Sequence, residues 1–513
     1  MLTMPLPRIR LVPTGSGATA VQIIWRYHQR RPILDHIGSA HTDHELELLK
    51  LKAQRLIDGN QLALDYPTTP PMSPTGTPEA PLAVASQRAG YLLDAITTIY
   101  HDIGLDQATC GDEIFKNLVI ARIIHPGSKL DSIETLAEVG VTSASYRTIT
   151  RALPKYATAS FQAALTKQLA SFARIGPGVL VLYDVTTLYF ETDTADELRK
   201  PGFSKERRLE PQVTVGLLTD GQGFPLAVHA FEGNKGETTT MIPVIEAFRA
   251  AYGLERITVV ADAGMFSESN KKSLVEAGLD YILGVKFRQL PYPVEVWRKD
   301  NPGAEYSDGQ IWCHKNRGGG GPDGVPIAIT YYQYSSSRAR RSIKGIDEQV
   351  AKAEKAVAGT IAIKRNRYVD LRAPRKRVNH ELAEKHRWLA GIKGYETSRV
   401  DLSAEEVIAA YRRLLKIEKS FRMSKSDLKA RPVFAHKAES IHAHLAVVMA
   451  AMAVGHKLEQ ASGLSLKRVV RTLRKYQTFT LEIGGQTVYA ATEVPVQVRD
   501  LLDRLGVGSG MSD

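Results

Sequence analysis

Three acidic residues stand where their side chains could act together on one substrate. Asp184 lies inside the apolar run "VLYDVTTLYF", Asp262 ends the apolar run "ITVVADAG", and Glu418 lies within "YRRLLKIEKSFRMSK". A carboxylate inside a buried strand is costly unless it is paired, protonated or bound to a cation. Because converging carboxylates repel one another, we expect divalent cations between them, and Mg²⁺ prefers such oxygen ligands. Two ions of this kind can promote attack on a phosphodiester.

The overall charge favours the same chemistry. The chain has 513 residues, a net charge of +12 and a pI near 9.4, a balance that suits polyanionic partners such as nucleic acid. Cys110 and Cys313 are far apart in the sequence and have no CxxC spacing, which argues against a disulfide framework or a cysteine-rich zinc site. The sequence shows neither an apolar run of ~20 residues nor a signal peptide. We therefore expect a soluble, intracellular protein that cleaves or transfers nucleic-acid strands.

The elements around the first two acids predict a mixed sheet flanked by helices. Residues 176–232 contain three strand-like runs joined by turns, and helix, strand, helix and strand follow up to residue 287. Asp262 then lies at the carboxyl end of a strand, the usual place for a ligand-binding residue in open α/β sheets.

The third acid is predicted to lie on one long helix. Ser403 is a suitable N-cap, with Glu406 completing a capping box. Tyr411, Glu418 and Lys425 are spaced seven apart and share one stripe. The neighbouring apolar stripe consists of Val407, Leu414, Ile417, Phe421 and Leu428.

Glu418 also has a purely structural alternative. Arg422 lies one helical turn further on, and the two side chains would form an i,i+4 ion pair.

Four blocks of the sequence resemble the DDE-type insertion-sequence transposases (the group-four-like superfamily), whose catalytic core is RNase H-like. The blocks are "LVLYDVTTLYFE", "LAVHAFEGNKGETTTMIPVIEAF", "VVADAGMFSESNKKSLVEAGLDYIL" and "YRRLLKIEKSFRMSKSDLKARPVFAHKAESIHAHL". The family signature at the last acid is Tyr, two residues, Arg, three residues, Glu, six residues and Lys. Its Arg position is Leu414 here, and Ala-Gly rather than Arg-Gly follows Asp262. These departures indicate a divergent subgroup.

The resemblance implies a site and a reaction. Asp184, Asp262 and Glu418 would be catalytic and would hold two Mg²⁺ ions, with Mn²⁺ as a substitute, while Tyr411, Arg422 and Lys425 would contact DNA. The enzyme would nick transposon ends and join the 3′-hydroxyl to target DNA, and relatives with a long insertion often pass through a hairpin. Its partners would be double-stranded DNA and a second copy of the chain in a synaptic complex, with no membrane. It would lie in the cytoplasm, associated with a prokaryotic nucleoid.

The implied fold is an RNase H-like mixed sheet flanked by helices, with a helical N-terminal region and a basic, partly β insertion before the last catalytic helix. The second and third acids are 156 residues apart, which leaves room for that insertion. The expected parts are a small α+β module (1–65), a linker (66–89), a helical DNA-binding region (90–175), the first part of the core (176–289), the insertion (290–385), the second part of the core with the glutamate helix (386–460) and a basic C-terminal tail (461–513).

Several motifs keep two interpretations. Residues 132–156 resemble a helix-turn-helix with Gly140 at the turn, and an ordinary helical hairpin fits them equally well. Trp312, Tyr331 and Tyr332 would either stack on a displaced base or pack in the core. The basic runs are either solvated faces or DNA contacts. We expect three histidines to pack in the protein or contact phosphate rather than bind metal: His436, His442 and His444.

Two other functions remain in view, and a third, a phosphatase, is set aside. "DVTT" is similar to the start of a haloacid-dehalogenase-type phosphatase motif, but Thr186 replaces the second aspartate that such a motif needs. A structure-directed RNase H-like nuclease that cuts without joining, or a domesticated DNA-binding relative, would keep the fold. The intact acids argue against an inactive relative, whereas cutting and joining share their first step.

Overall fold

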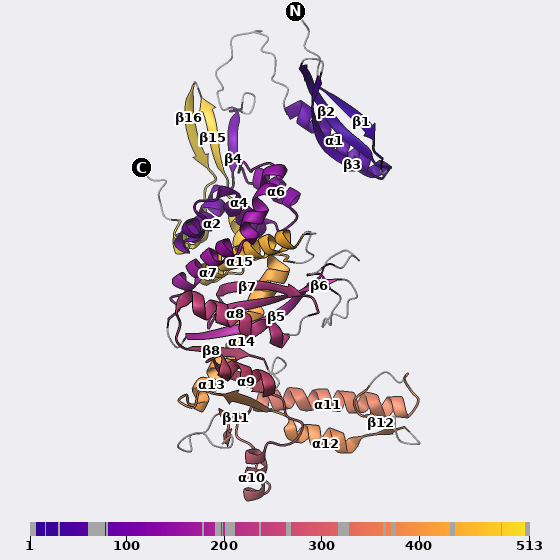
Figure 1. The fold of residues 1–513 in the computed structure, drawn as a ribbon, viewed down its shortest axis with the longest axis vertical. Helices are drawn as coiled ribbons and strands as arrows, with labels where there is room; N and C mark the ends of the chain where they lie inside the picture. Colours follow the sequence, from indigo (N-terminus) through magenta and orange to yellow (C-terminus); the bar gives the residue numbers. More distant parts are fainter. Residues whose placement is uncertain are drawn as a thin grey trace, which may run out of the picture. The chain divides into compact units, whose positions relative to one another are not determined.

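The computed structural model describes residues 7–15, 17–28, 31–59, 77, 81–176, 179–189, 196, 198–200, 211–234, 237–262, 268–316, 328–362, 366–370, 376–430, 437–483 and 485–507. The chain divides into two compact units, Met1–Pro81 and Leu82–Asp513 (Figure 1). Most of the expected linker lies outside the described residues, as do the glycine run 317–324 and His436.

The first unit is a small antiparallel sheet with one helix. The sheet has the order β1 (Arg8–Pro13), β2 (Thr19–His28) and β3 (Arg31–Ala40), followed by α1 (Asp43–Gly59). Its core contains four fully or nearly fully buried side chains: Val21, Ile23, Ala53 and Ile57. Strands followed by a helix agree with the small α+β module expected for residues 1–65. β1 is mostly exposed, so its apolar pattern is weak.

From Gly90 the second unit is helical, as predicted for residues 90–175. They are α2 (Gly90–Asp102), α3 (Leu105–Thr109), α4 (Glu113–Ile124), α5 (Lys129–Glu138), α6 (Tyr146–Ala157) and α7 (Ala159–Phe172). Local caps set their starts: Asp112 accepts from the Phe115 N–H, and Ser128 forms a capping box with Asp131. Gly140, between α5 and α6, has φ +79°, and a Cβ there would lie 2.2 Å from the Gln87 carbonyl oxygen.

The predicted mixed sheet flanked by helices is confirmed. Eight strands have the order β10-β11-β14-β9-β8-β5-β6-β7. Both β5–β8 and β8–β9 are parallel, and the other neighbours are antiparallel. The central elements are β5 (Val179–Tyr189), β6 (Gln212–Asp220), β7 (Pro225–Glu232), α8 (Glu237–Tyr252), β8 (Ile257–Ala261), α9 (Glu268–Glu276) and β9 (Asp280–Val285). β8 is buried along its whole length, which agrees with its mostly apolar sequence. β6 is buried except at its last residue, although it includes the polar residues Gln212, Thr214 and Thr219.

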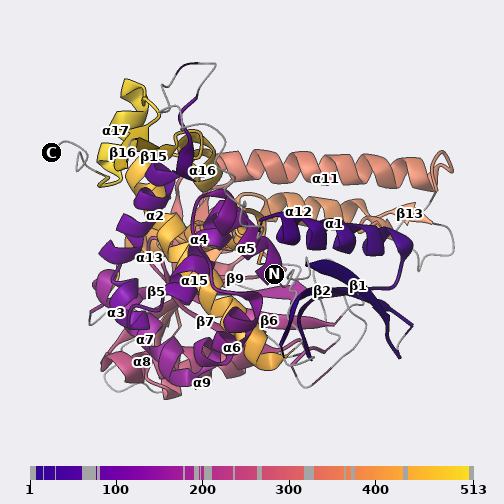
Figure 2. The same cartoon turned by 90° about the horizontal axis from the view of Figure 1, so that it is seen from above.

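The segment expected as an insertion joins the same sheet. It contains α10 (Tyr292–Asp300), β10 (Ile311–Asn316), β11 (Ala328–Tyr334), α11 (Ser336–Val357), β12 (Val369–Asp370), β13 (Arg377–Val378) and α12 (His380–Leu389). β11 pairs with β14 (Ile392–Thr397), which pairs with β9. α11 and α12 lie side by side in Figures 1 and 2 and bury a small core of their own around Tyr368 and Ala353.

The glutamate helix differs from the prediction. Instead of one long helix, α13 (Ala404–Arg412) and α14 (Leu414–Arg422) are separated at Arg413, and a π-helical turn, η2 (Met423–Asp427), follows. The Arg413 N–H bonds to Ala410 O and the Lys416 N–H to Arg413 O, so the helix tightens locally at the break. The Ser403–Glu406 capping box is present. The predicted apolar stripe is buried at all five positions: Val407, Leu414, Ile417, Phe421 and Leu428.

Residues beyond the glutamate helix complete the core. They form α15 (Ala438–Ser462), α16 (Leu466–Leu473), the strand pair β15 (Thr478–Ile483) and β16 (Gln486–Ala491), and α17 (Val496–Arg504). β15 and β16 form a hairpin, and β4 (Val84–Arg88) pairs with β15 as a third strand. The segment expected as a basic tail is therefore folded onto the helical region. α15 is long and apolar enough to cross a membrane, but 72% of its most apolar window is buried inside the protein, as in a core helix.

Candidate active site

The three predicted acids line one pocket. Its volume is about 460 Å³, and Asp184, Asp262 and Glu418 all contribute to its wall. The register of the parallel strands explains part of this arrangement. Leu182 on β5 is matched with Val260 on β8, so the two aspartates, each two residues further on, lie level on adjacent strands. α14 packs on β5 and brings Glu418 to the same pocket.

The acids share the pocket but do not form a closed ligand cluster. Among the described residues, no three His, Cys, Asp or Glu side chains are close enough to hold a metal ion together. Asp184 is partly buried, and Asp262 and Glu418 are exposed. Mg²⁺ is usually bound by one or two carboxylates, water and substrate phosphate rather than by an all-protein cage. The donor set therefore fits divalent cations that bind together with a phosphate substrate.

Tyr411 forms a hydrogen bond with the second acid, Asp262. Its ring is 4% exposed, and its hydroxyl donates to Asp262 Oδ1 at 2.7 Å. The ring packs edge-on against Tyr395, with centroids 5.1 Å apart. The contact of Tyr411 with DNA phosphate that the resemblance implied stays a prediction, but the hydroxyl proton already has an acceptor.

Three basic side chains that sequence reasoning did not place here also line the pocket: Arg338, Lys393 and Arg412. Lys393 Nζ lies 4.4 Å from the Tyr411 ring centroid. Burial lowers the pKa of Lys393, and the carboxylates of Asp262 and Glu418 oppose that shift. Lys393 lies on a strand, and Arg338 lies in a basic run that was read as a solvated face or a DNA contact. Neither sequence context pointed to this pocket.

The other predicted DNA contacts lie away from this pocket. Arg422 is exposed at the end of α14, and Lys425 is partly buried in η2, with its Nζ 5.8 Å from the Phe421 ring centroid. Neither lines the acidic pocket. Glu418 makes no ion pair with Arg422 in the part of the chain that the structure describes, so the structural alternative for Glu418 is not observed.

The aromatic residues of the inserted segment pack in the core. Trp312 is 7% exposed and stacks edge-on with Trp297 and Tyr306. Tyr332 packs against Phe287, which belongs to the same hydrophobic cluster. The packing interpretation therefore describes both side chains.

The mixed sheet carries three acids in one pocket, and comparison with known families shows which class of protein has this core. Residues 176–454 match the family model described as "Transposase DDE domain". This match covers more than half of the chain and contains all three acids, so the chain belongs to the DDE transposase family.

Two further comparisons give less information. One similar solved structure is that of the piggyBac transposase in a synaptic complex with hairpin DNA, at 10% identity and a TM-score of 0.34. The match covers 83% of this chain and 73% of that one. At this score the likeness carries no argument. No curated protein matches the chain in sequence.

Proposed function

We propose that this transposase nicks transposon ends and joins the freed 3′-hydroxyl to target DNA by two-metal-ion phosphoryl transfer. The main support for the proposal is that three acids line one pocket within the matched transposase domain: Asp184, Asp262 and Glu418. We also infer that the core is RNase H-like. The partial strand order β7-β6-β5-β8-β9 supports this, with β6 antiparallel and β8 parallel to β5.

Asp184, Asp262 and Glu418 would hold the divalent cations, with Mg²⁺ as the resident ion and Mn²⁺ as a substitute. When bound, such ions supply Lewis-acid activation of the attacking oxygen and stabilise the leaving oxygen. The protein's own contribution is to hold the three carboxylates on rigid elements. In this arrangement Tyr411 is a positioning residue, because its hydroxyl fixes Asp262.

The basic side chains of the pocket have a defined electrostatic role. Three carboxylates in one pocket repel one another. Arg338, Lys393 and Arg412 bring three positive charges to the same wall, so the lining is formally neutral. Their charges stabilise the acids before cations bind and attract a DNA phosphate afterwards.

The proposed partners are double-stranded DNA, as transposon end and target, and a second copy of the chain in a synaptic complex. The proposed location is the cytoplasm, on a prokaryotic nucleoid. A nuclease that cuts without joining is the second candidate, because the first hydrolytic step uses the same acids.

The test is cleavage and joining of the element's own flanking DNA with Mg²⁺. Asp184→Asn, Asp262→Asn and Glu418→Gln are each expected to abolish cleavage and to leave DNA binding largely intact. Glu405→Gln, an exposed acid on α13, is the matched control and is expected to cleave normally. Normal cleavage by any of the three site variants would refute the assignment. Nicks without joined products would favour the nuclease.

A further inference from the structure

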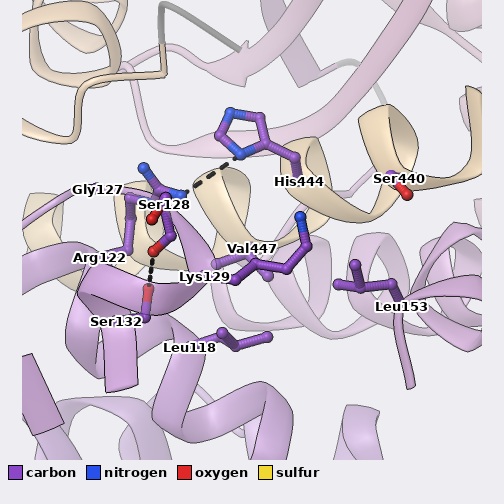
Figure 3. Close-up of a pocket in the computed structure, with 10 residues that line it drawn as sticks. All are labelled: Leu118, Arg122, Gly127, Ser128, Lys129, Ser132, Leu153, Ser440, His444 and Val447. Carbon is purple, nitrogen blue, oxygen red and sulfur yellow. Dashed lines mark hydrogen bonds between the residues drawn. The ribbon is translucent and has the colours of Figure 1, made fainter. Parts of the chain in front are cut away.

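A second, smaller cavity lies where α4, α5 and α15 meet (Figure 3). None of the acids of the candidate active site lines it. Its volume is about 50 Å³. The polar side chains in its wall are Arg122, Ser128, Lys129, Ser132, Ser440 and His444.

The cavity carries positive charge with little compensation. Figure 3 shows Arg122 and Lys129 reaching toward the space between α5 and α15. Arg122 makes no ion pair within the described parts of the chain, and the carboxylate that attracts its charge is Asp131. That carboxylate is committed elsewhere, because Asp131 Oδ2 accepts from the Ser128 N–H at 2.7 Å in the capping box.

The pKa values report the same imbalance. Burial lowers the pKa of Arg122 to about 10. Burial lowers the pKa of Lys129 as well, and the neighbouring Arg122 charge adds to this shift. Burial and mutual repulsion therefore destabilise the charged forms of both side chains. An anion bound between them would stabilise both charges.

His444 orients the arginine without adding charge. Burial lowers the pKa of His444 to about 3, and the Arg122 charge contributes, so its imidazole is neutral at physiological pH. The Nε2 atom lies 3.1 Å from Ala430 O, and Nδ1 lies 3.5 Å from an Arg122 Nη atom. A neutral ring that donates from Nε2 must accept at Nδ1, so His444 holds the guanidinium in place.

The N-terminus of α5 adds to the positive potential. This helix spans ten residues, and both Ser128, its N-cap, and Lys129, its first residue, line the cavity. Helix N-termini carry partial positive charge and suit phosphate groups. The cavity is larger than the roughly 10–15 Å³ that a single water needs, so it has room for a small polyatomic anion.

We propose that this cavity binds a phosphate group, held by Arg122 and Lys129. The phosphate is either one in a DNA backbone, which rests on the proposed function, or a free inorganic phosphate. A neighbouring feature favours DNA. A groove of about 750 Å³ is bounded by His125 and Pro126, directly before the Gly127–Lys129 wall of the cavity, and its basic residues are Lys429, Lys467, Arg468, Arg471, Arg474 and Lys475.

Calorimetric titration of the full chain with inorganic phosphate, at ionic strength balanced with chloride, tests the pocket itself. We expect saturable binding at one site that Arg122→Met weakens about tenfold or more, because a charge-assisted hydrogen bond contributes roughly 1.5–3 kcal/mol. Lys167→Met removes one exposed charge from α7 and is the matched control. Asp184→Asn is expected to bind phosphate normally, so failure of the catalytic proposal would not affect this result.

Melting temperatures separate a binding role from a structural one. Phosphate is expected to raise the melting temperature of the unsubstituted chain and of Lys167→Met, and to have little effect on Arg122→Met or Lys129→Met. Without phosphate, Arg122→Met is expected to melt at the same temperature or higher, because it removes a repulsive charge. A lower melting temperature together with retained stabilisation by phosphate would show that Arg122 is structural and would overturn the proposal.

A duplex-binding experiment distinguishes the two sources of phosphate. If the DNA backbone occupies the cavity, inorganic phosphate will displace a labelled duplex better than chloride at equal ionic strength, and Arg122→Met will weaken duplex binding more than Lys167→Met does. If phosphate binds without displacing DNA, the cavity binds free phosphate. Phosphate binding that is non-saturable, or that weakens equally in Lys167→Met, excludes the site.

Discussion

Replacing Tyr411 with phenylalanine isolates one hydrogen bond of the candidate active site. The ring is almost fully buried, packs edge-on against Tyr395 and lies beside Lys393, and phenylalanine keeps these contacts. The group lost is the hydroxyl that donates to Asp262 Oδ1 at 2.7 Å. The substitution therefore changes the orientation of Asp262 with little change in packing.

The expected effect on activity is larger than the effect on stability. A hydrogen bond to a charged group contributes roughly 1.5–3 kcal/mol, but Asp262 is exposed and water replaces the lost donor. We therefore expect a loss of about 1 kcal/mol or less in the free energy of unfolding. Groups that orient metal ligands typically affect metal affinity or activity by about 10- to 100-fold. We expect a loss of this size in cleavage, reduced at high Mg²⁺ concentration.

The assay is the initial rate of strand cleavage as a function of Mg²⁺ concentration, with duplex affinity measured in parallel. Tyr331→Phe is the matched control, because its hydroxyl bonds to Leu402 O, outside the pocket, at 3.3 Å. Cleavage by Tyr411→Phe that equals the control at every Mg²⁺ concentration would refute the positioning role. A loss confined to duplex affinity would instead support the DNA contact implied by the family resemblance.

Three further outcomes test the fold. Gly140→Ala is expected to lower the free energy of unfolding by about 1–3 kcal/mol more than Gly359→Ala does. Both glycines have φ +79°, but only a Cβ at Gly140 would meet a backbone atom, Gln87 O. Equal losses for the two variants in denaturant titrations would contradict this. His444 takes up a proton in the unfolded chain below its ordinary pKa of 6.5 but in the folded chain only near 3, so its contribution to stability is lost as pH falls through that window. His444→Gln should flatten this loss in unfolding titrations, and an unchanged pH profile would be inconsistent with a neutral buried ring. Lys429 has φ +41°, so Lys429→Gly should raise the unfolding free energy by about 1 kcal/mol, and a decrease would show that its side chain outweighs the strain.

Much of the central sheet could be predicted because its strands are continuous apolar runs separated by clear turns. The same pattern placed Asp262 at a strand end, and the helical period placed the apolar stripe of the glutamate helix on its buried side. These are local properties of the chain, and neighbouring residues alone determine them.

Features that depend on distant pairing could not be predicted. The pairing of Thr478 on β15 with Arg88 on β4 joins segments almost four hundred residues apart, and β4 is exposed along its length, so its sequence has no apolar period. The π-helical turn after α14 contains no glycine or proline, so its sequence has no signal that predicts a break in the helix. The basic lining of the acidic pocket was missed for the same reason, because Lys393 and Arg338 meet the acids only through the assembled sheet.

The basic lining of the acidic pocket depends in part on the inserted segment, residues 290–385. β11 brings Gln333 opposite Lys393 on β14, and Gln333 accepts a hydrogen bond from Arg412. α11, which follows β11 directly, supplies Arg338, which lines the same pocket and donates to Gly391 O. Two of the three positive charges that balance the carboxylates are thus supplied or held by the inserted segment, residues 290–385, which contributes Arg338 and holds Arg412 through Gln333. Because uncompensated carboxylates in one pocket would repel, this segment stabilises the site as well as extending the sheet.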